Sequence, residues 1–168
     1  MKLDDFKAKI SGKGGTAQSN YYEIIVNSPA GGDSNSVAMM CDSVVMPGRS
    51  IATTEYNQGK QTLKTPYTFI DSEVTASFIM TNDGLARNYF ADWIEFIMPA
   101  NDYTVKYKDQ YARDITIRQL NKNGDVVYAV TLQGAYPSNL NEYTLSNSEE
   151  NSVTKVEVTF VYDKFVKS

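Results

Sequence analysis

Short stretches in which apolar and polar residues alternate decide what this chain can fold into. Residues 73–80 place Glu73, Thr75 and Ser77 on one side of the alternation, and on the other side Val74, Ala76, Phe78 and Met80. Residues 153–162 repeat this pattern with the apolar series Val156, Val158, Phe160 and Tyr162. Because successive side chains of a strand point to opposite faces, both stretches are predicted to be half-buried strands.

Turn residues divide the rest of the chain into further strands. Residues 21–26 are rich in aromatic and β-branched side chains, and a second strand is predicted over residues 37–45, ended by the turn Met46-Pro47-Gly48. Residues 111–120 and 125–133 flank Asn121-Lys122-Asn123-Gly124, in which Asn-Gly is a strong hairpin signal. A chain of about seven short strands is therefore expected.

Residues 48–67 differ from the other strand candidates because they contain little deep apolar content. They carry Thr, Tyr, Ile and Leu among polar residues and are interrupted by Asn57-Gln58-Gly59. This pattern predicts an extended hairpin with its tip at the Asn-Gln-Gly segment. Such a hairpin has too few core residues to be stable alone.

The one convincing helix is predicted over residues 83–98. Thr81-Asn82-Asp83 supplies candidates for the N-cap, Pro99 marks the end, and apolar residues recur at helical spacing between them. The apolar stripe favours packing against a sheet over a cofactor site. Its predicted core residues, together with Leu85, are Tyr89, Phe90, Trp93, Ile94 and Ile97.

These elements predict a mainly β fold: an antiparallel β-sandwich or partly closed barrel, with one α-helix covering an opening and one extended β-hairpin. The length of 168 residues favours a single domain over residues 1–168. No apolar run approaches the roughly 18 residues of a spanning helix. Two carboxylates in Met1-Lys2-Leu3-Asp4-Asp5 stand where a signal peptide is apolar, so neither a membrane anchor nor that export route is expected.

The inventory of reactive residues argues against an enzyme. The chain has no histidine, and its single cysteine, Cys41, stands in an apolar stretch. Gly12-Lys13-Gly14-Gly15-Thr16 lacks the spacing of a phosphate-binding loop, and no pair of carboxylates stands out. We therefore expect no catalytic residues, no cofactor and no metal.

The charge pattern argues against tight nucleic-acid binding. The formal net charge is −4, from 16 basic and 20 acidic residues, and no stretch forms a basic stripe. Exposed sheet edges, a hairpin that cannot bury itself and twelve tyrosines are typical of a subunit that completes its structure with copies of itself. A monomeric β-sandwich whose tyrosines are half buried accounts for the same pattern.

Four segments carry a resemblance to a known family. They are Cys41-Asp42-Ser43-Val44-Val45-Met46-Pro47-Gly48, Tyr89-Phe90-Ala91-Asp92-Trp93, Gln110-Tyr111-Ala112-Arg113-Asp114 and Gly134-Ala135-Tyr136-Pro137-Ser138-Asn139-Leu140. In their order and spacing the chain is similar to the tail tube family of contractile-tailed bacteriophages. It departs from that family at Tyr136, where tryptophan also occurs, in a longer loop at residues 28–36, and in residues 164–168.

The resemblance implies a subunit of six-membered rings that stack head to tail into a hollow tube. Such a tube belongs to the virion tail, is assembled in the host cytoplasm, and works with sheath, baseplate and tail terminator proteins. Double-stranded DNA passes through it transiently without tight binding, and the tube has no direct membrane anchoring. The alternatives are the tube of a type VI secretion or other contractile injection system, whose cargo is protein, and a monomeric β-sandwich binding module.

The resemblance also implies roles for particular residues. The hairpin at residues 48–67 corresponds to the one that reaches the adjacent ring, with Ile51, Tyr56 and Leu63 as its expected buried contacts. Glu55, Glu73 and Asp114 are the candidates for charge in the lumen. Six copies at −4 each give −24 per ring, and an acidic wall repels DNA, which carries one charge every ~1.7 Å of its axis.

Overall fold

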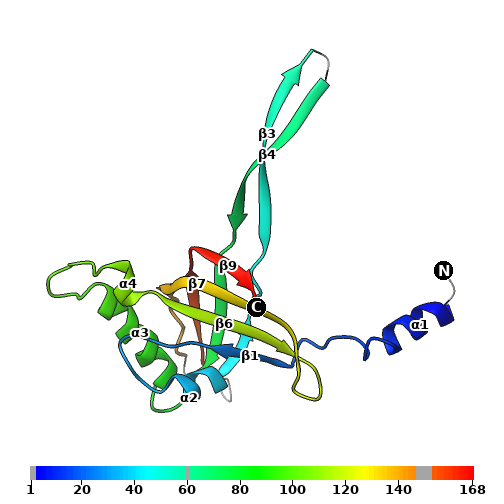
Figure 1. The fold of residues 1–168 in the computed structure, drawn as a ribbon. Helices are drawn as coiled ribbons and strands as arrows, with labels where there is room; N and C mark the ends of the chain where they lie inside the picture. The colour runs from blue at the N-terminus through cyan, green and yellow to red at the C-terminus, as the bar shows by residue number, and fades with distance from the viewer. Residues whose placement is uncertain (1–2, 60, 147–152) are drawn as a thin grey trace.

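A computed structural model describes residues 3–59, 61–146 and 153–168 of the protein (Figure 1). The chain forms strands and helices in the following order: α1 (Leu3–Ser11), β1 (Tyr22–Ile25), α2 (Ser34–Met39), β2 (Cys41–Val44), β3 (Arg49–Gln58), β4 (Gln61–Asp71), β5 (Val74–Ile79), α3 (Leu85–Ile97), α4 (Lys108–Tyr111), β6 (Arg113–Leu120), β7 (Val126–Leu140), β8 (Lys155–Val161) and β9 (Lys164–Lys167). No helix within the described ranges is both long and apolar enough to cross a membrane.

Two antiparallel sheets share the long strand β7. Sheet A has the order β1-β6-β7-β9 and uses the first part of β7. Sheet B has the order β7-β8-β5-β2 and uses residues Tyr136–Leu140 of the same strand. All these strand pairs are antiparallel, which confirms the predicted mainly β, antiparallel fold.

Gly134 forms the corner at which β7 passes from one sheet to the other. Its φ of 65° lies in the left-handed region that favours glycine. A Cβ atom at this position would lie 2.6 Å from Asp163 Oδ2, and the Gly134 N–H donates to Asp114 Oδ1 over 3.2 Å. Glycine is therefore required here both by the backbone angle and by the close approach of Asp163.

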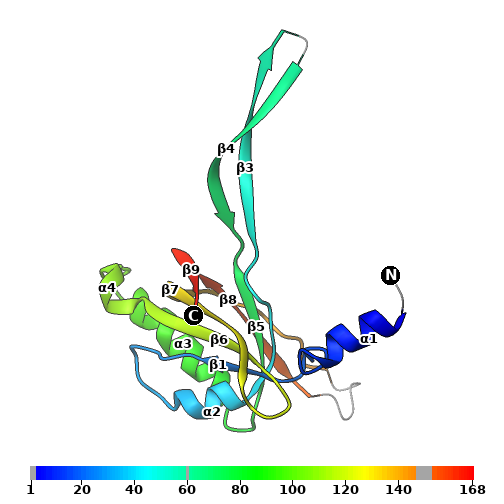
Figure 2. The same cartoon turned by 45° about the vertical axis from the view of Figure 1, so that its right-hand side comes forward.

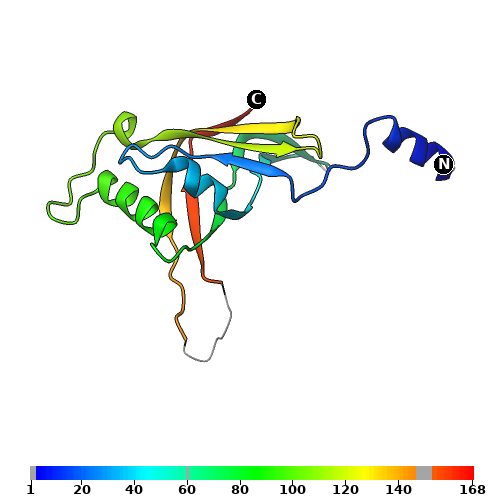
Figure 3. The ribbon, with the colours of Figure 1, turned by 90° about the horizontal axis from the view of Figure 1, so that it is seen from below.

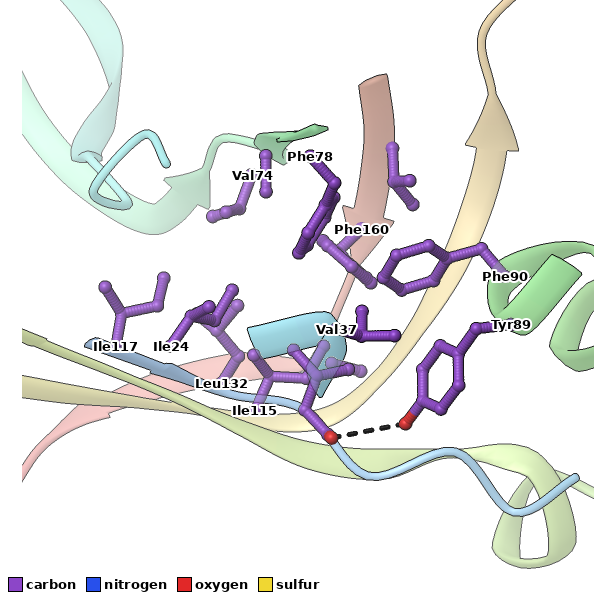
Figure 4. Packing of buried hydrophobic residues seen from close by; sticks show 14 of the residues in the cluster. Ile24, Val37, Val74, Phe78, Tyr89, Phe90, Ile115, Ile117, Leu132 and Phe160 are labelled. Atoms are coloured by element: carbon purple, nitrogen blue, oxygen red, sulfur yellow. Dashed lines mark hydrogen bonds between the residues drawn. The ribbon is translucent and has the colours of Figure 1, made fainter. Parts of the chain in front are cut away.

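Helix α3 packs against one side of the sheets and contributes side chains to the core (Figure 4). Tyr89, Phe90 and Trp93 are buried, whereas Ile94 and Ile97 are only partly buried. The Phe90 ring lies 4.8 Å from the Phe78 ring and 5.8 Å from the Phe160 ring, so it joins α3 to β5 and β8. Such aromatic burial is the largest contribution that single side chains make to a core.

Polar groups of two buried α3 side chains bond to neighbouring backbone. The Tyr89 hydroxyl donates to the Val26 carbonyl over 3.2 Å, and the Trp93 indole donates to the Tyr111 carbonyl over 3.0 Å. Both bonds satisfy groups that would otherwise be costly to bury. They also fix the segment that follows β1 and the last residue of α4 against the helix.

The sandwich closes only partly on the side opposite β7. There the edge strands β1 and β2 are not paired with each other, but the Tyr22 hydroxyl donates to the Cys41 carbonyl over 3.0 Å. This bond spans the gap between the two sheets. The two sheets therefore form a partly closed barrel that is open between β1 and β2.

Several local predictions differ from the structure. Residues 34–39 form α2 where a strand was expected to begin at Val37, because Asp33 caps a helix by accepting from the Ser36 N–H over 3.2 Å. Val37 is buried on that helix, and strand β2 begins only at Cys41. Helices α1 and α4 and strand β9 were not predicted, so α3 is not the one helix of the fold.

Strands β3 and β4 form a separate two-stranded sheet that projects from the body (Figures 1 and 2). Helix α1 also stands apart from the body and has no buried residue. Sheet A has one uncovered face, as Figure 3 shows, because α2, α3 and sheet B all lie on its other side. The hairpin, the uncovered face and the strand edges are the surfaces left for other molecules.

Candidate functional site: an assembly surface

Residues on β3 and β4 pair regularly along the projecting hairpin. The register runs from Arg49 opposite Asp71 to Gln58 opposite Gln61, with an irregularity between Ala52 and Thr53. Tyr56 lies opposite Leu63, and Ile51 lies opposite Phe69. Ile51 and Tyr56 are an odd number of positions apart in one strand, so they lie on opposite faces.

Large apolar side chains remain exposed on both faces of this hairpin. The expected contact residues Ile51, Tyr56 and Leu63 are 57%, 60% and 48% exposed. Three further residues, Tyr67, Phe69 and Ile70, were not predicted as contacts and are 67%, 63% and 55% exposed. Their apolar character in a polar stretch was the available signal. An apolar surface concentrated on one thin element is typical of a contact site for another protein.

The outer strands of sheet A offer backbone groups to a neighbour. Among the described strands, β1 pairs only with β6, and β9 pairs only with β7. Each outer strand therefore has one side without a strand partner. Open edges of this kind template pairing with another chain, and a closed ring removes them.

The uncovered face of sheet A carries short polar side chains and charges of both signs. Thr116 Oγ1 lies 3.3 Å from Thr131 Oγ1, which lies 2.7 Å from Ser168 Oγ. Arg118 forms an ion pair with Glu23 across β6 and β1 at 3.3 Å. Asp114 and Lys164 are exposed at the end of the sheet near Gly134.

The three candidates for lumen charge lie in different parts of the molecule. Glu55 lies in the middle of the hairpin and pairs with Lys64 at 3.0 Å. Glu73 is exposed between β4 and β5. Asp114 lies in β6 and accepts a hydrogen bond from Gly134. The structure therefore does not bring Glu55, Glu73 and Asp114 together on one surface.

Cys41 is held in its thiol form. Burial is the main cause that raises its pKa to about 11, and burial likewise raises the pKa of the neighbouring Tyr22 to about 12. A thiol with so high a pKa is a poor nucleophile. Within the described residues, no group of three or more His, Cys, Asp or Glu side chains is placed to hold a metal ion.

A family model described as phage tail tube protein matches residues 4–168. The chain belongs to the phage tail tube protein family. No protein with a curated description is a significant match to this tail tube protein.

Solved structures with a similar fold include chains from a contractile injection system. A chain from the sheath–tube complex of the PVC extracellular contractile injection system, in its extended state, has a TM-score of 0.68 at 18% identity, covering 100% of this chain and 98% of that one. A chain from the tube-terminating cap of the anti-feeding prophage has a TM-score of 0.69 at 17% identity, with 91% of each chain covered. A type six secretion system protein has a TM-score of 0.51 at 6% identity, covering 87% of this chain and 81% of that one.

Proposed function

We propose that this tail tube protein forms six-membered rings that stack into a hollow tube, and that the tube conducts double-stranded DNA into a host cell. The observation that carries the proposal is the projecting hairpin with its exposed apolar side chains. The open edges of β1 and β9 support ring closure, because the two edges lie on opposite sides of sheet A. Ring formation and ring stacking then use different surfaces.

The hairpin projects far from the body of the subunit (Figures 1 and 2). Strand β3 has 10 residues and β4 has 11, which at about 3.3 Å per residue gives a span of about 30 Å. Burying one large apolar side chain stabilises a contact by about 1.5 to 3 kcal/mol. Tyr56 and Leu63 are 60% and 48% exposed, so burying the exposed remainder contributes roughly half of this for each, about 1.5 to 3 kcal/mol per hairpin, repeated six times around the ring.

The proposed partners follow from the family and from the related complexes. Copies of the same chain form the rings, and sheath, baseplate and tail terminator proteins contact the tube. The tube is a structural component of the virion tail with no turnover of its own, assembled in the host cytoplasm. The sheath–tube, cap and baseplate complexes in which similar folds occur support these partners.

Microscopy of the purified protein and a hairpin variant tests this proposal. Negative-stain images of the wild-type chain are expected to show rings and tubes. Replacing Tyr56 and Leu63 together by serine is expected to leave rings but remove tubes, because the stacking contact loses its apolar pair. Replacing the neighbouring Thr54 and Thr65 by serine is the matched control and should leave tubes. A wild-type chain that stays monomeric at high concentration contradicts the proposal.

A second candidate is the tube of a contractile injection system that delivers protein. The observation that favours it is the similarity of fold to the PVC chain over the whole of this chain. Neighbouring genes distinguish the two candidates, because a capsid and a terminase gene accompany a virion tail and are absent from an injection system. Both candidates use the same ring and hairpin contacts.

A further inference from the structure

One side chain ties the root of the hairpin together. Arg49 is the first residue of β3, and its guanidinium donates from Nε to Asp71 Oδ1 over 2.8 Å and from Nη2 to Asp71 Oδ2 over 3.1 Å. Asp71 is the last residue of β4, so this two-pronged bond closes the hairpin at its base. The same Nη2 donates to the Phe165 carbonyl in β9 over 3.2 Å. One guanidinium therefore joins β3, β4 and β9.

Aromatic rings enclose this guanidinium. Its carbon lies 4.2 Å from the centre of the Phe165 ring and 5.1 Å from the centre of the Phe69 ring. The side chains of Arg49 and Asp71 are only 35% and 17% exposed. Partial burial and two-pronged geometry make such a pair stronger than an ordinary surface ion pair. By contrast, the Glu55–Lys64 pair higher in the hairpin has side chains 56% and 66% exposed.

The segment that contains β9 contacts the root at a second point. The Tyr162 hydroxyl donates to the Ser72 carbonyl over 2.5 Å, and the Tyr162 and Phe165 rings pack edge to face at 6.3 Å. Gly48 and Ser72, which flank the hairpin, bond to each other through the Ser72 hydroxyl. Among the described residues of β3 and β4, Arg49 is the one whose side chain bonds to the body.

In a hairpin attached only at its root, a small rotation at the root causes a large displacement of the tip. Because the hairpin is about 30 Å long, a rotation of about 10° at the root moves the tip by about 5 Å, which is the spacing of one strand. Such a displacement takes Tyr56 and Leu63 out of a fixed contact. The direction in which the hairpin leaves the body therefore has to be set where it joins the body.

We infer that Arg49 is the positioning residue of the hairpin: it aims the stacking surface by holding the hairpin root to the edge strand β9. The inference rests on the proposed function, in which β9 also lies at the edge offered to the next subunit in a ring. A contact that β9 makes with the next subunit of a ring then acts on Arg49 through the Phe165 carbonyl and ring. Arg49 in turn acts on the position of the hairpin. Lateral assembly and axial stacking are coupled at this one side chain.

The direction of the hairpin can be measured in the isolated subunit. Spin labels at Thr65→Cys in the hairpin and Asn123→Cys in the turn between β6 and β7, in a Cys41→Ala background, report the distance between hairpin and body. The doubly labelled chain with Arg49 intact is expected to give one narrow distance distribution. Arg49→Gln is expected to lose that narrow peak and give a broad distribution.

Two further variants separate geometry from charge. Lys64→Gln removes the same charge from the same hairpin but breaks only the Glu55–Lys64 pair, so its distance distribution should stay narrow. Arg49→Lys keeps the charge but loses the two-pronged bond and the flat packing between rings, so its distribution should broaden. A narrow distribution in either Arg49 variant overturns the inference, and so does a Lys64→Gln distribution as broad as that of Arg49→Gln.

The distance measurement does not depend on assembly, so it tests the role of Arg49 separately from the proposed function. If the wild-type chain fails to form rings, the proposed function fails while the labelled distances still report on Arg49. In the assembly assay, Arg49→Gln is expected to form rings but to lose long tubes, whereas Lys64→Gln forms both. Tubes of wild-type length from Arg49→Gln overturn the claim that the aim of the hairpin controls stacking.

Discussion

Cys41 and Tyr22 meet between the edge strands β1 and β2 of the two sheets. Their contact joins β1 to β2 through the Cys41 carbonyl, and the thiol itself donates weakly to the Ser43 carbonyl. Burial raises the pKa of both groups, so both stay neutral in the folded protein over the physiological range. At this position the side chains serve the fold, and the thiol is not poised for chemistry.

The reactivity of Cys41 gives a direct check of this description. Its alkylation by iodoacetamide should be slow near pH 8 and should rise only as the pH approaches the raised pKa of about 11. The urea-unfolded chain is the control, since its thiol should titrate near the ordinary pKa of 9.0. A folded thiol that reacts at pH 8 as fast as the unfolded one contradicts the burial of Cys41.

The same pKa shifts predict the alkaline limit of stability. A raised pKa in the folded state favours the neutral form, so its contribution is complete below the unfolded pKa and is lost as the pH rises through the folded pKa. For Cys41 that window runs from 9.0 to about 11, and for Tyr22 from 10.0 to about 12. The free energy of unfolding, measured in urea, should fall across this range, and Tyr22→Phe should remove part of the fall.

Truncation of Phe90 should be costly, because this residue is fully buried and joins α3 to both β5 and β8. Phe90→Ala is expected to lower the free energy of unfolding by about 3 to 5 kcal/mol through lost burial and a cavity. Phe6→Ala is the matched control, because Phe6 lies on α1 and is 46% exposed, so its loss should change the isolated subunit by less than about 0.5 kcal/mol. Equal effects at the two positions would show that Phe90 does not anchor the core.

At the scale of elements, the sequence predicts those strands whose alternation is long. The buried apolar series Val74, Ala76 and Phe78 marks β5 and the series Val156, Val158 and Phe160 marks β8, and the two strands pair with each other, although Ser77 of β5 is also buried. Strand β9 was missed because its 4 residues gain their role only from pairing with β7, which no local pattern reveals. Helix α2 was missed because Asp33 and the serines that follow it were read as a flexible loop.

The candidate site likewise has one part that the sequence predicts and one part that it does not. The hairpin is visible in the sequence as a polar stretch with isolated large apolar residues, and the structure places Ile51, Tyr56 and Leu63 on its exposed surface. The contact of Arg49 with Phe165 joins residues that are 116 positions apart. Spacing in the sequence gives no information about such a contact, because it depends on how β9 returns to the hairpin root.

Helix α1 is an element that the isolated subunit does not need. It has no buried residue, and Leu3 and Phe6 are 66% and 46% exposed. Deleting residues 1–14 is therefore expected to leave the midpoint of thermal unfolding of the monomer unchanged, as measured by circular dichroism. A lower midpoint in the truncated chain would show that α1 packs on the body in solution.

For the whole molecule, where the charges lie matters more than their sum. The net charge of −4 suggested an acidic tube wall, but the candidates Glu55, Glu73 and Asp114 lie apart. On the uncovered face of sheet A, Glu23 and Asp114 stand with Arg118 and Lys164, so these four charges balance. If this face lines the tube, the wall has a low affinity for DNA because it presents hydroxyl groups and balanced charges, and not because it repels DNA strongly.

A single added charge on that face tests whether this face would meet DNA in the proposed tube. Thr131 lies in the central strand β7, between Thr116 and Val166 of the neighbouring strands. Thr131→Lys adds one positive charge per subunit, and tubes of this variant are expected to retain short duplex DNA in sedimentation at low salt and release it as salt rises, because lysine–phosphate contacts release counterions. Wild-type tubes and Thr131→Gln tubes, which match the variant in size without the charge, should retain none. If Thr131→Lys tubes also fail to retain DNA, the uncovered face of sheet A does not line the proposed path for DNA, and the wall has to be sought on another face of the subunit.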